Sequence, residues 1–232
     1  MFSENNKIIL NKFKNKFDLN IKFKNDLLNL IKRIFNNKKE INLVIPGGDS
    51  IKEFYEIFFK ENLDWNRFNI SLTDERWVHQ SSKKSNENLI YSILKKNLID
   101  KKNFFPLKGN SKDIDTAIKI NNSKLAKLLP IDILILGMGI DGHTASLFRE
   151  DQNLINLLSS FNSNITGMAK HENLNRITLT QKSLISAKNK FLYINGTDKL
   201  KTLESALDKK SSDYYPIYNF LKSDISIYWS EK

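Results

Sequence analysis

The chain has 232 residues, of which 40% are hydrophobic and 11% aromatic, a composition typical of a folded globular protein rather than a disordered one. It has no cysteine, which excludes disulfides and thiolate nucleophiles, and its three histidines lack the H-x-x-x-H spacing of a metal site, so we expect no metal and no cofactor. The net charge of +11 comes from lysines scattered along the chain without a long basic block; this argues against a nucleic-acid site, although the charge would help to steer an anion to a cleft.

The stretch 1–17 carries charges throughout and lacks the apolar centre of a signal peptide. No apolar run in the rest of the sequence approaches the roughly 20 residues that cross a bilayer. We therefore expect a cytoplasmic protein that makes no membrane contact.

The first predicted elements are an amphipathic helix over 18–37, from its apolar spacing, and a short strand over 41–45 that ends at Pro46. A helix over 50–61, a strand over 68–73 and, after a loop that reads DERWVHQSSKK, a helix over 85–96 are expected next. The later predicted elements are a helix over 117–128, a strand over 131–136, strands over 176–180 and 190–195 that each precede a helical run, and a last strand over 224–229 at an edge of the sheet.

This alternation of strands and helices predicts the α/β class, with a mostly parallel sheet covered by helices on both faces. The sequence shows no internal repeat, no low-complexity linker and no break in composition. We therefore expect a single domain over residues 1–232.

Gly137, Gly139 and Gly142 form a G-x-G-x-x-G directly after the strand over 131–136, which is the spacing of a dinucleotide-binding loop. Such a site also needs an acidic residue roughly 20 positions later to hold the ribose, and the segment FNSNIT at 161–166 has none. Charged residues at 149–151 interrupt the helix that should follow, and His143 has no role in that motif. The dinucleotide interpretation is therefore disfavoured.

Three polar or glycine-rich loops follow predicted strands, at the end of a parallel sheet where ligands usually bind. The loop at 46–50 joins a strand to a helix, so Gly47 and Gly48 could bring backbone N–H groups to a phosphate. An ordinary turn with Asp49 or Ser50 as the helix N-cap explains this loop equally well.

The other two loops carry ionisable groups. Asp74, Glu75 and Arg76 could supply a guanidinium for an oxyanion and a carboxylate that orients a histidine or a sugar hydroxyl, or they could form a solvated charge cluster. His143, which Asp141 and Thr144 flank, is either structural or a base for water, since the reference pKa of histidine is near 6.5.

Together these loops resemble the 6-phosphogluconolactonase family, within the larger group that includes glucosamine-6-phosphate deaminase. The resemblance runs from about Phe23 to Tyr215. The segments that carry it are, in order of specificity, GMGIDGHTASLF, TDERWV with the downstream Ser85-Asn86, RITLT, and Gly196-x-x-Lys199.

The resemblance implies a Rossmann-like, doubly wound sheet and the hydrolysis of 6-phosphoglucono-δ-lactone to 6-phosphogluconate, the second step of the oxidative pentose phosphate pathway, without metal or cofactor. His143 would deprotonate the attacking water with help from Asp141, while Arg76 and Asp74 would lie near the lactone or the sugar hydroxyls. The implied phosphate-binding residues are Gly47, Gly48, Ser50, Arg176 and Lys199.

Two alternatives remain beside the lactonase. A glucosamine-6-phosphate deaminase-like isomerase would carry an acidic residue five positions after the histidine, where this chain has Phe148. A sugar-phosphate-binding module without turnover would follow if Asp49, which replaces a hydroxyl residue of the family's phosphate loop, repels the phosphate by ~1 kcal/mol in water or ~4 kcal/mol at an effective dielectric of 20. The sequence is compatible with a monomer or a homodimer.

Overall fold

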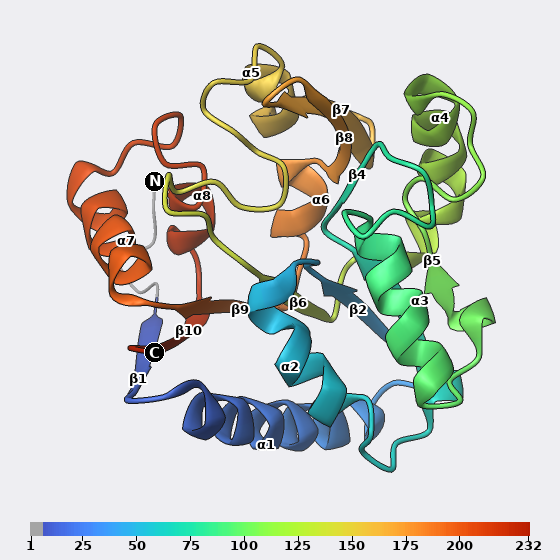
Figure 1. Ribbon diagram of the computed structural model, residues 1–232, viewed down its shortest axis with the longest axis vertical. Coiled ribbons are helices and arrows are strands. Elements are labelled where there is room, and N and C mark those ends of the chain that lie inside the picture. The colour runs from blue at the N-terminus through green and yellow to red at the C-terminus, as the bar shows by residue number, and fades with distance from the viewer. Residues whose placement is uncertain (1–6) are drawn as a thin grey trace.

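The computed structural model describes residues 7–232 and has seven strands in one parallel sheet, flanked by helices (Figure 1). In their order across the sheet the strands are β1 (Ile8–Phe13), β10 (Ile225–Ser230), β9 (Asn189–Asn195), β6 (Ile133–Leu136), β2 (Ile41–Ile45), β3 (Phe68–Leu72) and β5 (Phe104–Phe105). Every pairing between neighbours in this sheet is parallel, which confirms the predicted fold class.

A second, small antiparallel sheet lies beyond the carboxyl ends of the main strands (Figure 1). Its strands in order are β4 (Asp74–Arg76), β8 (Leu174–Leu179) and β7 (Thr166–His171). The predicted strand at 176–180 is therefore β8 and belongs to this sheet. The prediction of a loop from residue 74 was wrong for its first three residues, because their backbone pairs with β8.

Most of the helices fall on segments that were predicted to be helical, but those at 154–158 and 218–221 were not predicted. The helices are α1 (Lys16–Phe35), α2 (Asp49–Phe58), α3 (Asn86–Lys96), α4 (Ile114–Lys124), α5 (Leu154–Leu158), α6 (Gln181–Ile185), α7 (Thr197–Lys209) and α8 (Tyr218–Leu221). Short 3₁₀ turns lie at Trp65–Arg67, Lys101–Asn103 and Ala126–Leu128, so the predicted helix over 117–128 ends early and tightens into the last of these turns.

The last strand, β10, is not at an edge of the sheet, which contradicts the prediction. Residues 8–13 form β1 outside it, with Ile8 opposite Ile225. The sequence IILNKF lies in a lysine- and asparagine-rich segment and exposes most of its side chains, so no burial pattern marks it as a strand. Residues 1–6, part of the stretch that was expected to lack a signal peptide, lie outside the described residues. No helix within residues 7–232 combines the length and apolar character that a bilayer crossing requires.

Phe23 of α1 anchors the helix to the sheet. Its side chain is fully buried, and its ring centroid lies 4.6 Å from that of Tyr228 on β10 and 5.8 Å from that of Tyr193 on β9. The ring of Phe54 on α2 lies 4.7 Å away, so the same side chain joins both helices to the sheet.

Replacing Phe23 by alanine is expected to lower the free energy of unfolding by about 3–5 kcal/mol, because the rigid aromatic cluster cannot close the cavity. Urea denaturation measures this. Phe17→Ala, on the same helix at a side chain that is 71% exposed, is the matched control and should change stability by less than about 0.5 kcal/mol. Equal losses in the two variants would contradict the assigned packing.

Candidate active site

The loops after β2 and β6 leave neighbouring strands in a region where the chain order of the sheet reverses. Such a switch point opens a crevice at the carboxyl ends of the strands. A cavity of about 220 Å³ lies there. Seven of the predicted site residues line it, namely Gly47, Ser50, Asp74, Arg76, His143, Arg176 and Lys199.

Two of the predicted site residues do not line the cavity. Asp141 contacts His143 without lining the cavity, and Gly48 is the N-cap of α2 with a φ of +98°. The expectation that Asp49 or Ser50 caps this helix was wrong, since α2 begins at Asp49 and has no side-chain cap. Asp49 is exposed and does not line the cavity.

Asp141 and His143 form a close pair. The Asp141 Oδ1 atom lies 2.6 Å from His143 Nδ1 and 3.3 Å from the His143 backbone nitrogen. Partial burial alone would raise the pKa of Asp141, but the hydrogen bonds from His143 outweigh it and lower the pKa to about 2. Because an ionised carboxylate only accepts hydrogen bonds, Nδ1 donates this one, and in the neutral imidazole the second ring nitrogen is the one with a lone pair.

The glycines of the opening motif shape this pair. A Cβ on Gly139 would lie 2.3 Å from His143 Nδ1 and 2.4 Å from Asp141 Oδ1, so a side chain there would displace both groups. Gly142 has a φ of +83° and lies against Tyr215, while Gly137 accepts a 2.7 Å hydrogen bond from the Thr144 hydroxyl. No helix follows Gly142 directly, because the next one is α5 at residue 154. The loop therefore lacks the helix N-terminus of a dinucleotide site, as expected.

Two arginines face each other across the small sheet. Arg76 on β4 and Arg176 on β8 are directly opposed, and each has a buried Nε atom without a hydrogen-bond partner. Like charges at opposed positions destabilise a sheet. Burial lowers the pKa of Arg176, the Asp74 carboxylate raises it and the Arg76 guanidinium lowers it further. The pair is therefore electrostatically suited to an anion in the cavity.

Asp74 is held by hydroxyl groups. Its Oδ2 atom accepts a 2.6 Å hydrogen bond from Ser146 and its Oδ1 atom a 3.0 Å bond from Thr73, and Arg176 Nη1 lies 3.8 Å from Oδ2. Ser146 is completely buried, and sequence reasoning missed it although it lies within the most specific motif. Its pairing partner is 72 residues away, so no local pattern signals it.

The first turn of α3 contributes Asn86 to the cavity wall and is held in place by the Glu75 carboxylate of β4. The buried Glu75 carboxylate accepts hydrogen bonds from the backbone nitrogens of Arg76, Asn86 and Glu87 and from the Ser85 hydroxyl, at 2.5–2.9 Å. Asn86 donates to the Asp74 carbonyl at 2.9 Å and packs so closely on Gly47 that a Cβ there would lie 2.0 Å from its Cγ atom. Glu75 is thus a structural cap, and Asn86, which lines the cavity, was not among the predicted site residues.

Lys199 enters the cavity from the first turn of α7, which begins after Gly196 at a φ of +93°. Partial burial lowers the pKa of its ammonium group. Within residues 7–232 it has no carboxylate in ion-pair range. With the two arginines it gives the small cavity three cationic groups beside the single carboxylate of Asp74.

Phe148 packs against the imidazole of His143. The two ring centroids are 4.3 Å apart, and the His171 ring is stacked on Phe148 at 4.1 Å. The Arg176 guanidinium lies 5.0 Å from the Phe148 centroid. The position that separates the two predicted enzyme classes is thus occupied by a buried apolar ring that contacts the histidine.

Comparison with known proteins gives three likenesses over most of the chain. A family model described as glucosamine-6-phosphate isomerases/6-phosphogluconolactonase matches residues 14–229. Proteins named 6-phosphogluconolactonase from Pseudomonas aeruginosa and Pseudomonas putida are each 36% identical, over 190 and 195 residues, covering 81% and 83% of this chain and 80% of each relative. The crystal structure of a 6-phosphogluconolactonase from Shewanella baltica OS155 has a TM-score of 0.88, covers 97% of this chain and 98% of its own, and is 24% identical, a likeness of fold.

Glu87, next to Asn86, has a raised pKa that should make the stability of the fold depend on pH. Burial raises its pKa to about 7, against hydrogen bonds from the Lys108 and Gly109 backbones and with the help of the nearby Glu75 charge. An acid with a raised folded-state pKa stabilises the fold fully below its unfolded pKa of ~4.3 and loses that contribution as the pH rises through about 7. The loss is on the order of 3 kcal/mol.

Stability should therefore fall with pH between about 4.5 and 7.5 more steeply in the wild type than in Glu87→Gln, whose side chain does not ionise. Urea denaturation across this range measures the slope. Glu204→Gln, at an exposed position of α7, should keep the wild-type slope. Indistinguishable slopes for wild type and Glu87→Gln would show that Glu87 is not the titrating group.

Proposed function

The chain belongs to the glucosamine-6-phosphate isomerase/6-phosphogluconolactonase family, and we propose that it opens 6-phosphoglucono-δ-lactone with a water molecule that His143 deprotonates. The observation that supports this most directly is that one cavity contains His143, already paired with an ionised Asp141, together with Arg76, Arg176 and Lys199. A base for water and cationic groups for an anionic substrate are the two requirements of the reaction.

The chemistry proceeds without a covalent intermediate. The unprotonated ring nitrogen of His143 takes a proton from water, and the hydroxide attacks the lactone carbonyl carbon. The Asp141 carboxylate stabilises the imidazolium that forms, since it already accepts a hydrogen bond from Nδ1. The tetrahedral oxyanion then collapses, the bond to the ring oxygen breaks, and that oxygen takes the proton from His143 to give 6-phosphogluconate.

Binding and orientation fall to the surrounding loops. We assign the phosphate to the Gly47–Gly48 turn, Ser50, Arg176 and Lys199, because Gly47 and Ser50 line the same cavity as the two cationic side chains and Arg176 has a buried Nε atom without a partner. Arg76 and Asp74 are assigned to the lactone end, next to His143. The exposed position of Asp49 removes the repulsion that favoured a binding module without turnover.

The deaminase-like isomerase is disfavoured by the same cavity. Ring opening of an amino sugar in that enzyme relies on an acidic residue five positions after the histidine. Here Phe148 fills that place, and Asp141 is the one carboxylate within hydrogen-bond distance of His143 among the described residues. We also infer that residues 1–232 form one domain, a proposal supported by the pairing of β1 with β10, which joins distant parts of the chain in one sheet.

His143→Ala is expected to lower kcat on the order of 10²–10⁴-fold, because no general base then deprotonates the attacking water. The lactone also hydrolyses spontaneously, so the rate must be measured as the excess over buffer. His79→Ala is the matched control, since His79 is exposed and its side chain hydrogen-bonds only to Ser81 among the described residues. A well-folded His143→Ala protein with wild-type kcat would overturn the assignment.

Lys199→Gln is expected to raise KM for the phosphorylated lactone on the order of tenfold, since one charged contact to phosphate is lost. The same variant should act on unphosphorylated glucono-δ-lactone as the wild type does, because that substrate has no phosphate. Lys201→Gln, two residues along α7 at an exposed side chain, is the control. A similar loss on both lactones would place Lys199 elsewhere than at the phosphate.

A further inference from the structure

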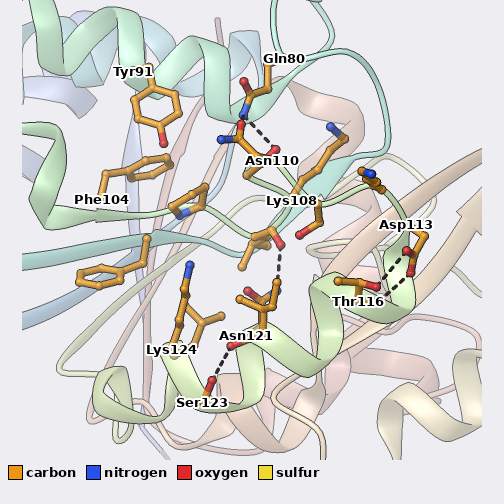
Figure 2. Close-up of a pocket in the computed structure, with 18 of the residues that line it drawn as sticks. Gln80, Tyr91, Phe104, Lys108, Asn110, Asp113, Thr116, Asn121, Ser123 and Lys124 are labelled. Atoms are coloured by element: carbon orange, nitrogen blue, oxygen red, sulfur yellow. Dashed lines mark hydrogen bonds between the residues drawn. The ribbon is translucent and has the colours of Figure 1, made fainter.

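A second cavity, of about 940 Å³, lies between α3, β5 and α4 and shares no lining residue with the catalytic cavity (Figure 2). Its volume falls within the range of about 300–1,000 Å³ that is usual for small-molecule sites. Nothing in the lactonase reaction uses it. Its wall is formed by the chain from β5 through the start of α4, by one face of α4 and by Gln80 and Tyr91 from the other side.

The cavity is basic. Four lysines line it, namely Lys108, Lys112, Lys124 and Lys127, and none of them has a carboxylate within 4.0 Å in the part of the chain that the structure describes. The one acidic lining residue, Asp113, caps α4 by accepting hydrogen bonds from the Thr116 backbone and hydroxyl at 2.8 and 2.9 Å. The positive charge of the cavity is therefore left for an anion from solution.

Aromatic rings lie beside these cations. Tyr91 of α3 and Phe104 of β5 pack edge to face with centroids 4.8 Å apart, and the Lys127 ammonium lies 4.1 Å from the centroid of Phe105. Figure 2 shows the side chain of Lys124 projecting from α4 toward the side of the cavity where Tyr91 and Phe104 lie. A ligand in this space contacts rings and ammonium groups at the same time.

The wall is held in place before any ligand binds. Gln80 donates hydrogen bonds to the Gly109 carbonyl at 2.9 Å and to Asn110 Oδ1 at 3.2 Å (Figure 2). The buried carboxylate of Glu87 accepts from the Lys108 backbone at 2.6 Å, and the buried Asn121 donates to the Leu107 carbonyl at 2.9 Å. Such preorganisation reduces the entropy lost on binding.

From these features we propose that the cavity binds a free nucleoside phosphate, with its phosphate among the four cavity lysines and its base against the aromatic wall. Phosphate pairs with ammonium groups, and a nucleobase stacks favourably on an aromatic ring. A sugar phosphate would use only the cations. A nucleic-acid strand needs rings spaced along a continuous groove, whereas these rings are gathered in one cavity.

Isothermal titration calorimetry of the full chain with AMP, ADP and ATP tests the proposal, with adenosine, ribose 5-phosphate and inorganic phosphate as partial probes. At least one nucleotide should bind at a ratio of one to one, and each partial probe at least tenfold more weakly. Lys124→Gln/Lys127→Gln and Phe105→Leu should each weaken nucleotide binding at least tenfold. Both should keep the wild-type thermal midpoint within a few degrees and wild-type lactone hydrolysis, which shows that they fold.

The matched control is Lys95→Gln/Lys119→Gln, which removes the same charge from exposed positions of α3 and α4 outside the cavity and should bind as the wild type does. Excess 6-phosphogluconate should leave nucleotide binding unchanged, because the catalytic cavity is separate. The proposal is overturned by absence of heat at millimolar nucleotide, by equal weakening in the control, by inorganic phosphate binding as tightly as nucleotide, by displacement with 6-phosphogluconate, or by tighter binding of an oligonucleotide.

Discussion

The walls of both cavities depend on the hydrogen bonds that the buried Glu75 carboxylate accepts from the start of α3. This carboxylate joins β4 to the first turn of α3 by accepting hydrogen bonds from the backbone nitrogens of Asn86 and Glu87 and from the Ser85 hydroxyl. Burying a carboxylate is costly unless it is fully hydrogen-bonded, and burial does raise its pKa despite these bonds. These hydrogen bonds help to hold Arg76 and Asn86 in the wall of the catalytic cavity. In the next position Glu87 supports the loop that walls the second cavity, so one helical turn organises two binding surfaces.

Charge in the catalytic cavity is arranged for a ligand rather than for the empty protein. Two opposed arginines and a half-buried lysine are balanced within the cavity by Asp74, whose oxygens are also engaged by two hydroxyl groups. The Asp141 carboxylate is committed to His143 and has a strongly lowered pKa. Three cationic groups beside one carboxylate in this cavity support the proposal that the phosphate of the lactone, and not only the sugar, contributes to recognition.

Local sequence was sufficient for the elements whose side chains are buried on both faces or at helical spacing. The strands β2, β3 and β6 and the loops that follow them were predicted from apolar runs and from glycine or charge at their ends, which is why most site residues could be named. The elements and residues that were not predicted from the sequence are determined by contacts with distant parts of the chain. β1 exposes most of its side chains and exists through pairing with β10, and residues 74–76 become a strand because β8, about a hundred residues later, lies beside them. Ser146 and Asn86 likewise act through contacts that no local pattern reveals.

The pairing of β1 with β10 has a consequence for how the protein is made. Hydrogen bonds at this edge join residues more than 200 positions apart, and Lys7 also bonds to Asp224. On the ribosome, β1 therefore emerges long before β10, its neighbour among the described strands, and its isoleucines remain without that partner until residues 225–230 have been made. Contacts of such sequence separation form slowly and leave a strand open to other chains in the meantime. Closure of this edge is thus expected to be a late step of folding.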